Sequence, residues 1–533
     1  MPHSPETQLI HYKETGRFSK IILDYLEGSA LHDFYKHPVD LQGIKDAIAD
    51  RNKFKTDREL LVEQLLKQYS SVPPSDKILS IINTLREENT YTICTAHQPN
   101  IFTGHLYFIY KIIHVIKLAD QLRAQLPGSN FVPVFYMGSE DADLEELGHI
   151  YLSGVKYEWK TKQKGAVGRM LVDKELVNML DEISGQINVL PFGIQVINQL
   201  KENYQIGTTI ELATFRLLHS LFEEYGLIIL LPDNKQLKNS MLPVFENELF
   251  ENQSSAIVNQ SSAALEKEYK AQAYPREINL FYLKNDIRNR IIRIRDHFKV
   301  EGTDIEFTRQ ELSNELKDHP ERFSPNVILR GLYQETILPN IVFVGGGGEL
   351  AYWLQLKSLF EFFEVPYPML VLRNSFIHIE PKVAEIMEKN EITIVDIFTD
   401  PQSLMKKVVN TLSALNLSLE EELNDVKDVY GHIKSHAELV DPTLGNHVSA
   451  LHAQVTKRLL SLEKKMLKAE KKKFDAEKRQ INKIFAALFP SDNLQERVDN
   501  FLPYYGKYGK EFFREIYDAS LGLEQKFTVI IKN

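Results

Sequence analysis

Short, continuously apolar runs recur along the chain and alternate with helical segments. They cover residues 91–95, 131–137, 227–231, 341–344 and 369–372 (YTICT, FVPVFYM, LIILL, IVFV and MLVL). Strands of a parallel sheet that are covered on both faces have this uninterrupted apolar character, whereas strands with one exposed face alternate. We therefore predict an α/β fold with a doubly wound, Rossmann-like core.

The regions around these runs have a different pattern. Residues 1–88 place apolar side chains at helical spacing, and we predict that this helical segment packs on a core formed by 89–395. The core holds extra material at about 150–335, which indicates an inserted connecting region. Within it, Thr308 and Glu311 form a capping box that opens a helix.

The stretch 396–490 is helical and rich in charge. Its apolar side chains recur every three or four residues, at Val448, Leu451, Val455, Leu459, Leu462, Met466 and Ala469. Such a narrow seam is typical of a coiled coil. We predict an antiparallel coiled-coil arm in which 404–433 is the partner and 441–445 the turn, after which 491–533 returns to the core.

Composition narrows the classes of function. The chain has 533 residues, a net charge of −10 and a single cysteine, Cys94. Nucleic-acid binding requires a cationic surface, so this acidic balance argues against a nucleic-acid partner. One cysteine excludes an intramolecular disulfide and fits a reducing compartment. No signal-peptide pattern opens the sequence, and charged residues interrupt the most apolar helix, 106–126. We expect a cytoplasmic protein without a membrane partner.

The loop at 95–105 follows the first predicted strand and precedes a helix. A glycine at 104 allows the backbone to approach a ligand, and the helix N-terminus offers N–H groups to an anion. We predict catalytic roles for His97 and His105, with His105 preferred, because either could stabilise charge that builds on an activated acyl group. Ligand-binding roles are expected for Gln98, Asn100, Thr103 and Gly104. The structural alternative is a polar turn that caps a core helix.

An acidic loop follows the second predicted strand. Ser139, Glu140 and Asp141 lie nearest the strand end. Bunched carboxylates repel one another and usually meet a cation, so Glu140 and Asp141 are candidates to bind a substrate amine or to act as a base, beside Ser139 as a binding residue. The alternatives are a solvated helix start and a metal site at 143–149. We assign no metal ligand.

Four consecutive glycines, Gly345, Gly346, Gly347 and Gly348, follow the strand at 341–344 and precede Glu349. Because such a run is costly in entropy, it favours a backbone cradle for a phosphate or carboxylate. The loop is not a Walker A motif, since no Gly-Lys-Ser/Thr follows. Arg330 and Arg373 are further candidates to receive an anion, with a structural ion pair as the alternative for each.

Together these segments resemble one family, the cysteine ligase family of bacillithiol biosynthesis. The resemblance lies in TAHQPNIFTGHLYFIYKIIHVIKLA at 95–119, VPVFYMGSEDADLEELGH at 132–149, SPNVILRGLYQETILPNIVFVGGGGELAYWLQLK at 324–357 and LQERV at 494–498. Gly104-His105 also resembles the end of the (His/Thr)-x-Gly-His signature of nucleotidyltransferases, although position 102 is Phe. One departure is Ala96-His97-Gln98-Pro99-Asn100, where the family is expected to have Gly-Gln-Gln and a small residue.

The resemblance implies a Rossmann-like core of nucleotidyltransferase type and a coiled-coil arm that supports a homodimer. The implied reaction joins the carboxyl group of cysteine to the amino group of glucosaminyl-malate, with ATP as the expected cofactor. It implies a malate-binding role for Arg330, and Asn326, Glu349 and Tyr352 join the binding residues.

Two other functions stay open at this point. One is an acyl- or nucleotidyl-transferase that acts on a different amine. The other is a non-catalytic, dimeric nucleotide-binding scaffold, which predicts that the glycine loop and the acidic loop point away from each other. The ligase hypothesis predicts that Gly104, Glu140 and Gly346 converge on one pocket.

Overall fold

The computed structural model describes residues 6–28, 30–73, 75–413 and 418–532, and the chain divides into two compact units. The first unit comprises Met1–Ile377 and Leu494–Ile530, and the second comprises His378–Asn493 and Ile531–Asn533. The segment Leu494–Ile530 therefore belongs to the first unit, although His378–Asn493 of the second unit precedes it in the chain.

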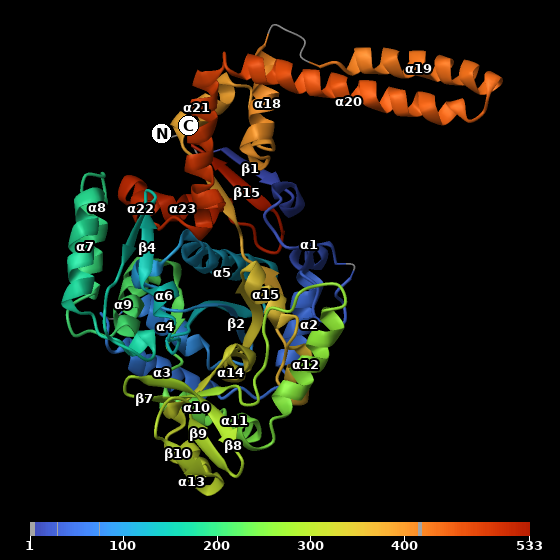
Figure 1. Cartoon of the computed structure of the whole chain (residues 1–533). Coiled ribbons are helices and arrows are strands. Elements are labelled where there is room, and N and C mark those ends of the chain that lie inside the picture. The colour runs from blue at the N-terminus through green and yellow to red at the C-terminus, as the bar shows by residue number, and fades with distance from the viewer. Residues whose placement is uncertain (1–5, 29, 74, 414–417, 533) are drawn as a thin grey trace. The chain divides into compact units, whose positions relative to one another are not determined.

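A five-stranded parallel sheet forms the centre of the first unit (Figure 1). Its order is β13-β12-β2-β3-β6. The strands are β2 (Thr90–His97), β3 (Asn130–Met137), β6 (Ile228–Leu230), β12 (Asn340–Gly345) and β13 (Met369–Leu372). Every neighbouring pair is parallel. Each predicted apolar run is thus a strand of one sheet, which confirms the Rossmann-like core.

The order of the strands places a topological switch point between β2 and β12. The chain builds the sheet outward from β2 through β3 to β6, then returns to the other side of β2 with β12 and β13. Ligands of doubly wound sheets bind in the crevice beyond the carboxyl ends of the strands at such a point. Helix α5 (Leu106–Gln125) packs against β2 and β3, and α2 (Leu41–Arg51) packs against β12.

Burial in this sheet explains the apolar runs. Ile93, Cys94 and Val344 are fully buried, because helices cover both faces of the inner strands. Burial raises the pKa of the Cys94 thiol well above its ordinary value, so that the thiol is an inert core group.

The N-terminal segment is mostly helical, as predicted. Its helices are α1 (Lys20–Glu27), α2, α3 (Arg58–Tyr69) and α4 (Asp76–Thr84). The sequence did not predict the strand β1 (Glu6–Ile10), which is hydrogen-bonded to β15 (Phe527–Ile531) in a sheet of order β1-β15-β14, with β14 at Phe376–Ile379. Because this pairing joins the two ends of the sequence, no pattern among neighbouring residues predicts it.

The inserted region expected at 150–335 is not continuous, because the core strand β6 interrupts it. The hairpin β4 (His149–Leu152) and β5 (Val155–Glu158) precede β6, as do α7 (Lys174–Ile187), α8 (Gly193–Asn203) and α9 (Ile210–Phe222). After β6 come α10 (Lys235–Asn239), α11 (Leu242–Phe250) and α12 (Gln253–Leu265). The predicted capping box is present at the start of α13 (Arg309–Asp318), where Thr308 accepts from the Glu311 N–H at 3.2 Å.

A second, antiparallel five-stranded sheet lies in the later part of this region. Its order is β10-β9-β8-β7-β11. The strands are β7 (Leu280–Lys284), β8 (Ile287–Ile294), β9 (His297–Val300), β10 (Glu306–Thr308) and β11 (Phe323–Pro325). Helix α14 (Val327–Ile337) then leads back into β12 of the core.

The second unit is helical and contains a coiled-coil hairpin, but the helix that pairs with 444–471 is 420–440 and not the predicted stretch 404–433, which is divided between two helices. Its helices are α17 (Pro381–Lys389), α18 (Pro401–Leu412), α19 (Glu420–Val440), α20 (Leu444–Lys471) and α21 (Asp475–Leu488). Helices α19 and α20 lie side by side (Figure 1), and the rings of Tyr430 and His452 are 5.4 Å apart across them. Among the residues that the structure describes, every helix is too short or too polar to cross a membrane.

Candidate functional site

A cavity of about 370 Å³ opens at the carboxyl edge of the parallel sheet. The loops that follow β2, β3, β12 and β13 contribute to its wall, as do β8, the start of α14 and the C-terminal segment. Its lining is Ala96, His97, Gln98, Tyr107, Lys111, Tyr136, Gly138, Glu140, Asp141, Glu146, Pro232, Arg288, Pro325, Asn326, Val327, Arg330, Gly346, Gly347, Gly348, Glu349, Tyr352, Arg373 and Arg497.

Most of the residues singled out from the sequence line this cavity. They are His97, Gln98, Glu140, Asp141, Asn326, Arg330, Gly346, Gly347, Gly348, Glu349, Tyr352 and Arg373. The others lie outside the lining: Asn100, Thr103, Gly104, His105, Ser139 and Gly345. The acidic loop and the glycine loop therefore meet at one site, while the second half of the 95–105 loop does not take part.

The loop at 100–105 binds another part of the protein instead of the cavity. Gly104 has φ +62°, and a Cβ there would lie 2.8 Å from the Cβ of Asn100, so only glycine fits. Asn500 donates from Nδ2 to the carbonyl oxygens of Phe102 at 2.9 Å and of Gly104 at 2.5 Å. His105 places Nδ1 3.0 Å from the Val498 carbonyl oxygen. The expected preference for His105 over His97 is therefore wrong as to which histidine faces the cavity.

His97 is a neutral hydrogen-bonding group in the cavity wall. Its pKa is lowered to about 3, chiefly by burial. The nearby Lys111 ammonium also lowers this pKa, and its effect is larger than the opposite effect of Glu349. Its Nδ1 lies 3.2 Å from the Gln98 carbonyl oxygen, and its ring is 5.4 Å from that of Tyr107. At neutral pH it is uncharged, so it can stabilise developing charge only by donating or accepting a hydrogen bond.

A buried ion pair joins helix α5 to the glycine loop. Lys111 is only 2% exposed, donates to the Ala96 carbonyl oxygen at 3.0 Å and forms an ion pair with Glu349. Burial alone would raise the pKa of Glu349, but the Lys111 ammonium and the hydrogen bond from the Gly346 N–H hold it below its ordinary value. Lys111 was not among the site residues predicted from the sequence, although a lysine inside an otherwise apolar helix was an available signal.

The four glycines have different roles, since one is needed for packing and three line the cavity. A Cβ at Gly345 would lie 2.7 Å from side-chain atoms of Leu350 and Phe343, so that glycine is required by packing. Gly346, Gly347 and Gly348 line the cavity at the start of α15 (Gly347–Trp353). The Gly346 N–H donates to the Glu349 carboxylate at 2.8 Å. The backbone exposed to the cavity is therefore that of the last three glycines.

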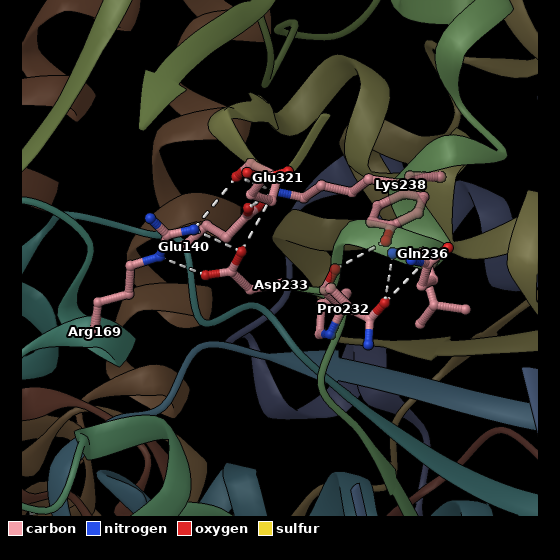
Figure 2. Close-up of polar contacts among 10 residues, drawn as sticks. Glu140, Arg169, Pro232, Asp233, Gln236, Lys238 and Glu321 are labelled. Carbon is pink, nitrogen blue, oxygen red and sulfur yellow. Dashed lines mark hydrogen bonds and ion pairs between the residues drawn. The ribbon is translucent and has the colours of Figure 1, made fainter. Parts of the chain in front are cut away.

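Glu140, a residue of the cavity lining, belongs to a buried charge network (Figure 2). Lys238, which has no exposed surface, forms an ion pair with Glu140 and lies 3.5 Å from Asp233, and it donates to the Glu321 carbonyl oxygen at 3.2 Å. Arg169 holds Asp233 through two bonds of 2.6 and 2.8 Å. Burial raises the pKa of Glu140, although Lys238 opposes the shift. Glu140 is thus already neutralised by the protein.

The cavity also holds charged groups without an opposite charge of their own. Arg330 donates to the Tyr352 hydroxyl at 2.7 Å, and within the described ranges no carboxylate forms an ion pair with it. Glu146 has no hydrogen-bond or ion-pair partner for its carboxylate among the described residues, and burial and the neighbouring acids raise its pKa. These groups remain available to charges on a ligand.

Asp141 and Arg373 are engaged to different degrees. Asp141 accepts from Gln98 Nε2 at 3.0 Å and is 3.7 Å from Arg288. Arg373 makes a two-bond ion pair with the buried Glu496, at 2.9 and 2.7 Å. For Arg373 the structure therefore shows the structural ion pair that was the alternative to anion binding. In the part of the chain that the structure describes, no group of three His, Cys, Asp or Glu side chains could hold a metal ion.

Comparison with known proteins settles the family. The N-terminal Rossmann-like domain of bacillithiol biosynthesis BshC matches residues 6–374, and the C-terminal coiled-coil domain of BshC matches residues 376–531. The chain belongs to the BshC family. Three relatives carry the name "Putative cysteine ligase BshC". Those of Flavobacterium johnsoniae and Christiangramia forsetii are each 37% identical, and that of Flavobacterium psychrophilum is 38% identical. Each match covers 98% of this chain and 99% of the relative.

Membership of the BshC family confirms the expected ligase and the two-part architecture. The Rossmann-like match spans the first part of the chain and contains every residue of the cavity except Arg497. Arg497 comes from the part that matches the coiled-coil domain. The boundary between the matched domains therefore does not coincide with the boundary of the cavity.

Proposed function

We propose that this BshC chain joins the carboxyl group of cysteine to the amino group of glucosaminyl-malate. The observation that carries the proposal is the single cavity in which Asp141 and Glu146 face the same space as Arg330 and the backbone of Gly346–Gly348. Carboxylates suit the ammonium group of an amino sugar, and Arg330 suits a carboxylate of malate. The surface thus matches a substrate that carries both signs of charge.

ATP is the proposed source of the driving force. Forming an amide from a free carboxylate is uphill in water, and ATP would supply an activated acyl group with a good leaving group. The residues present fit its phosphates, because Gly346, Gly347 and Gly348 expose their backbone to the cavity. The protein's own part is to hold the reacting groups close together, with the neutral His97 as a hydrogen-bonding group at the wall.

The direct test is product formation. Purified protein incubated with cysteine, glucosaminyl-malate and ATP should form a thiol whose mass equals that of the two substrates less one water, as measured by mass spectrometry. The matched control omits ATP and should give no product. The proposal is wrong if both substrates and ATP bind but no such thiol appears.

Two alternatives predict other outcomes. An acyl- or nucleotidyl-transferase for a different amine would consume ATP with cysteine but leave glucosaminyl-malate unchanged. The scaffold hypothesis required the acidic and glycine loops to point apart, yet Glu140 and Gly346 line the same cavity. The cavity therefore favours chemistry over a scaffold, although Gly104 does not reach it.

We also propose that the chain is a homodimer through its coiled-coil arm. In the arm itself, Val448 is buried, but Leu451 is 40% and Leu462 is 48% exposed, so the hairpin leaves part of its seam uncovered. A second arm would cover these side chains. The cytoplasmic location stays a prediction of the sequence.

Replacing both Leu451 and Leu462 by glutamate should halve the mass in solution. Light scattering across a dilution series should give twice 61.6 kDa for the unchanged chain and 61.6 kDa for the variant. The reason is that each glutamate would bury a charge in the proposed interface. Val189→Glu, at a position 81% exposed in the first unit, is the control and should remain dimeric. A variant that keeps the dimer mass would contradict the arm as the interface.

A further inference from the structure

The segment that follows the helical arm is fastened to the loop at 102–106. Besides the Asn500 bonds described above, the Leu106 N–H donates to the Asp499 carbonyl oxygen at 2.8 Å. On the other side of the segment, Glu496 is fully buried and pairs with Arg373. Residues 496 and 498–500 are therefore held at fixed points of the first unit, and the backbone between them is held with them, while the side chain at position 497 is partly exposed.

That side chain is Arg497, and it lines the cavity. It lies in a short 3₁₀ turn, Gln495–Arg497. The N–H of Arg497 donates to the Leu494 carbonyl oxygen at 2.9 Å. Glu496 turns toward Arg373, while Arg497 turns toward the cavity. Among the described residues, no side-chain hydrogen bond and no ion pair engages the Arg497 guanidinium.

A second cation lies near Arg497. Partial burial lowers the pKa of Arg497, and the positive charge of Arg373 lowers it by more than Glu496 raises it. Two guanidinium groups thus share the single carboxylate of Glu496, which Arg373 already holds with two bonds. Arg497 is therefore a partly exposed guanidinium in the cavity wall, beside a carboxylate that Arg373 already engages, and it is free to pair with an anion that enters the cavity.

We propose that Arg497 binds an anionic oxygen group of a substrate, either a carboxylate or a phosphate, and so completes the cavity from the C-terminal segment. This inference rests on the proposed function for the identity of the molecule. The charge that it assigns to the ligand follows from Arg497 and its neighbours alone. Guanidinium groups form two parallel hydrogen bonds with either kind of group, and the two sources are a malate carboxylate and a nucleotide phosphate.

Replacing Arg497 by glutamine should weaken binding of one small anion by about tenfold or more, since a charge-assisted hydrogen bond is lost. Isothermal titration calorimetry on the full chain would measure the dissociation constants of L-malate and of inorganic pyrophosphate. A loss confined to malate assigns Arg497 to the carboxylate, and a loss confined to pyrophosphate assigns it to the phosphates. Arg497→Lys keeps the charge without the planar guanidinium, and its affinity for the anion should lie between that of the unchanged chain and that of Arg497→Gln.

Arg514→Gln is the matched control, because Arg514 lies in α23 (Lys510–Ala519) of the same C-terminal segment with its side chain 70% exposed. It should bind both anions as the unchanged chain does. The thermal unfolding midpoint should be the same for Arg497→Gln and the control, since the bonds that hold the segment come from its neighbours. The inference is overturned if Arg497→Gln binds both anions with unchanged affinity, or if the unchanged chain binds neither. If Arg497→Gln loses anion binding as expected but the unchanged chain forms no ligase product, only the proposed function is contradicted.

Discussion

Replacing Lys238 by methionine is expected to lower the free energy of unfolding of the first unit by about 3–5 kcal/mol, because it leaves a buried carboxylate without its counter-charge. Lys238 has no exposed surface and is the ion-pair partner of Glu140 (Figure 2), a residue of the cavity lining. Asp233 keeps Arg169 as a second partner, so Glu140 bears most of the loss. Both tryptophans, Trp159 and Trp353, lie in the first unit, so urea unfolding followed by tryptophan fluorescence reports on this unit.

A double variant distinguishes lost charge pairing from lost packing. Adding Glu140→Gln to Lys238→Met removes the unpaired carboxylate, and it should recover more than half of the lost stability. Lys201→Met is the control, since the exposed pair of Lys201 with Asp181 should contribute about 1 kcal/mol or less. If Glu140→Gln adds its own loss to that of Lys238→Met, the network is not held together by this charge pair.

Replacing Gly346 by valine is expected to lower kcat/KM by about a hundredfold or more while leaving the fold intact. Gly346 has φ −73° and ψ 168°, a conformation open to any residue, and a Cβ there would lie 3.4 Å from Glu349 and 3.7 Å from Arg373. The first carbon therefore fits, but the two further methyl groups would occupy cavity space beside the exposed backbone. Misplacing a substrate by about 1 Å is sufficient for such a loss. Steady-state rates of thiol formation measure it.

Two further variants are the controls for this prediction. Gly346→Ala adds only the atom that fits and should be less impaired than Gly346→Val. Gly185→Val, on the exposed face of α7 where a Cβ meets nothing within 4 Å, should retain the activity of the unchanged chain. Activity of Gly346→Val equal to that of Gly185→Val would contradict the assignment of the glycine loop to substrate binding.

Much of the fold followed from local patterns. The apolar runs predicted the strands of the parallel sheet because strands covered on both faces must be apolar at every position. The seam of α20 and the capping box of α13 were readable for the same reason, since each depends on residues only three or four positions apart. The acidic and glycine loops could be predicted to meet, because all strands of a parallel sheet end at one edge.

Pairings between distant segments decided the rest. No residue near Gly104 or His105 in the sequence indicates that Asn500 and Val498 lie beside them in the fold. His105 contacts Val498 instead of lining the cavity, and His97 is the histidine that faces it. Likewise, Arg373 meets Glu496 only because the C-terminal segment returns to the first unit.

The sequence alone therefore determined the core sheet, the coiled-coil arm and the edge at which the candidate site forms. Only the tertiary structure decided which charges are already neutralised by the protein and which remain for a ligand. The physical reason is that the state of a charged group depends on its neighbours in space, and Lys111, Lys238 and Arg497 acquire theirs across long sequence separations.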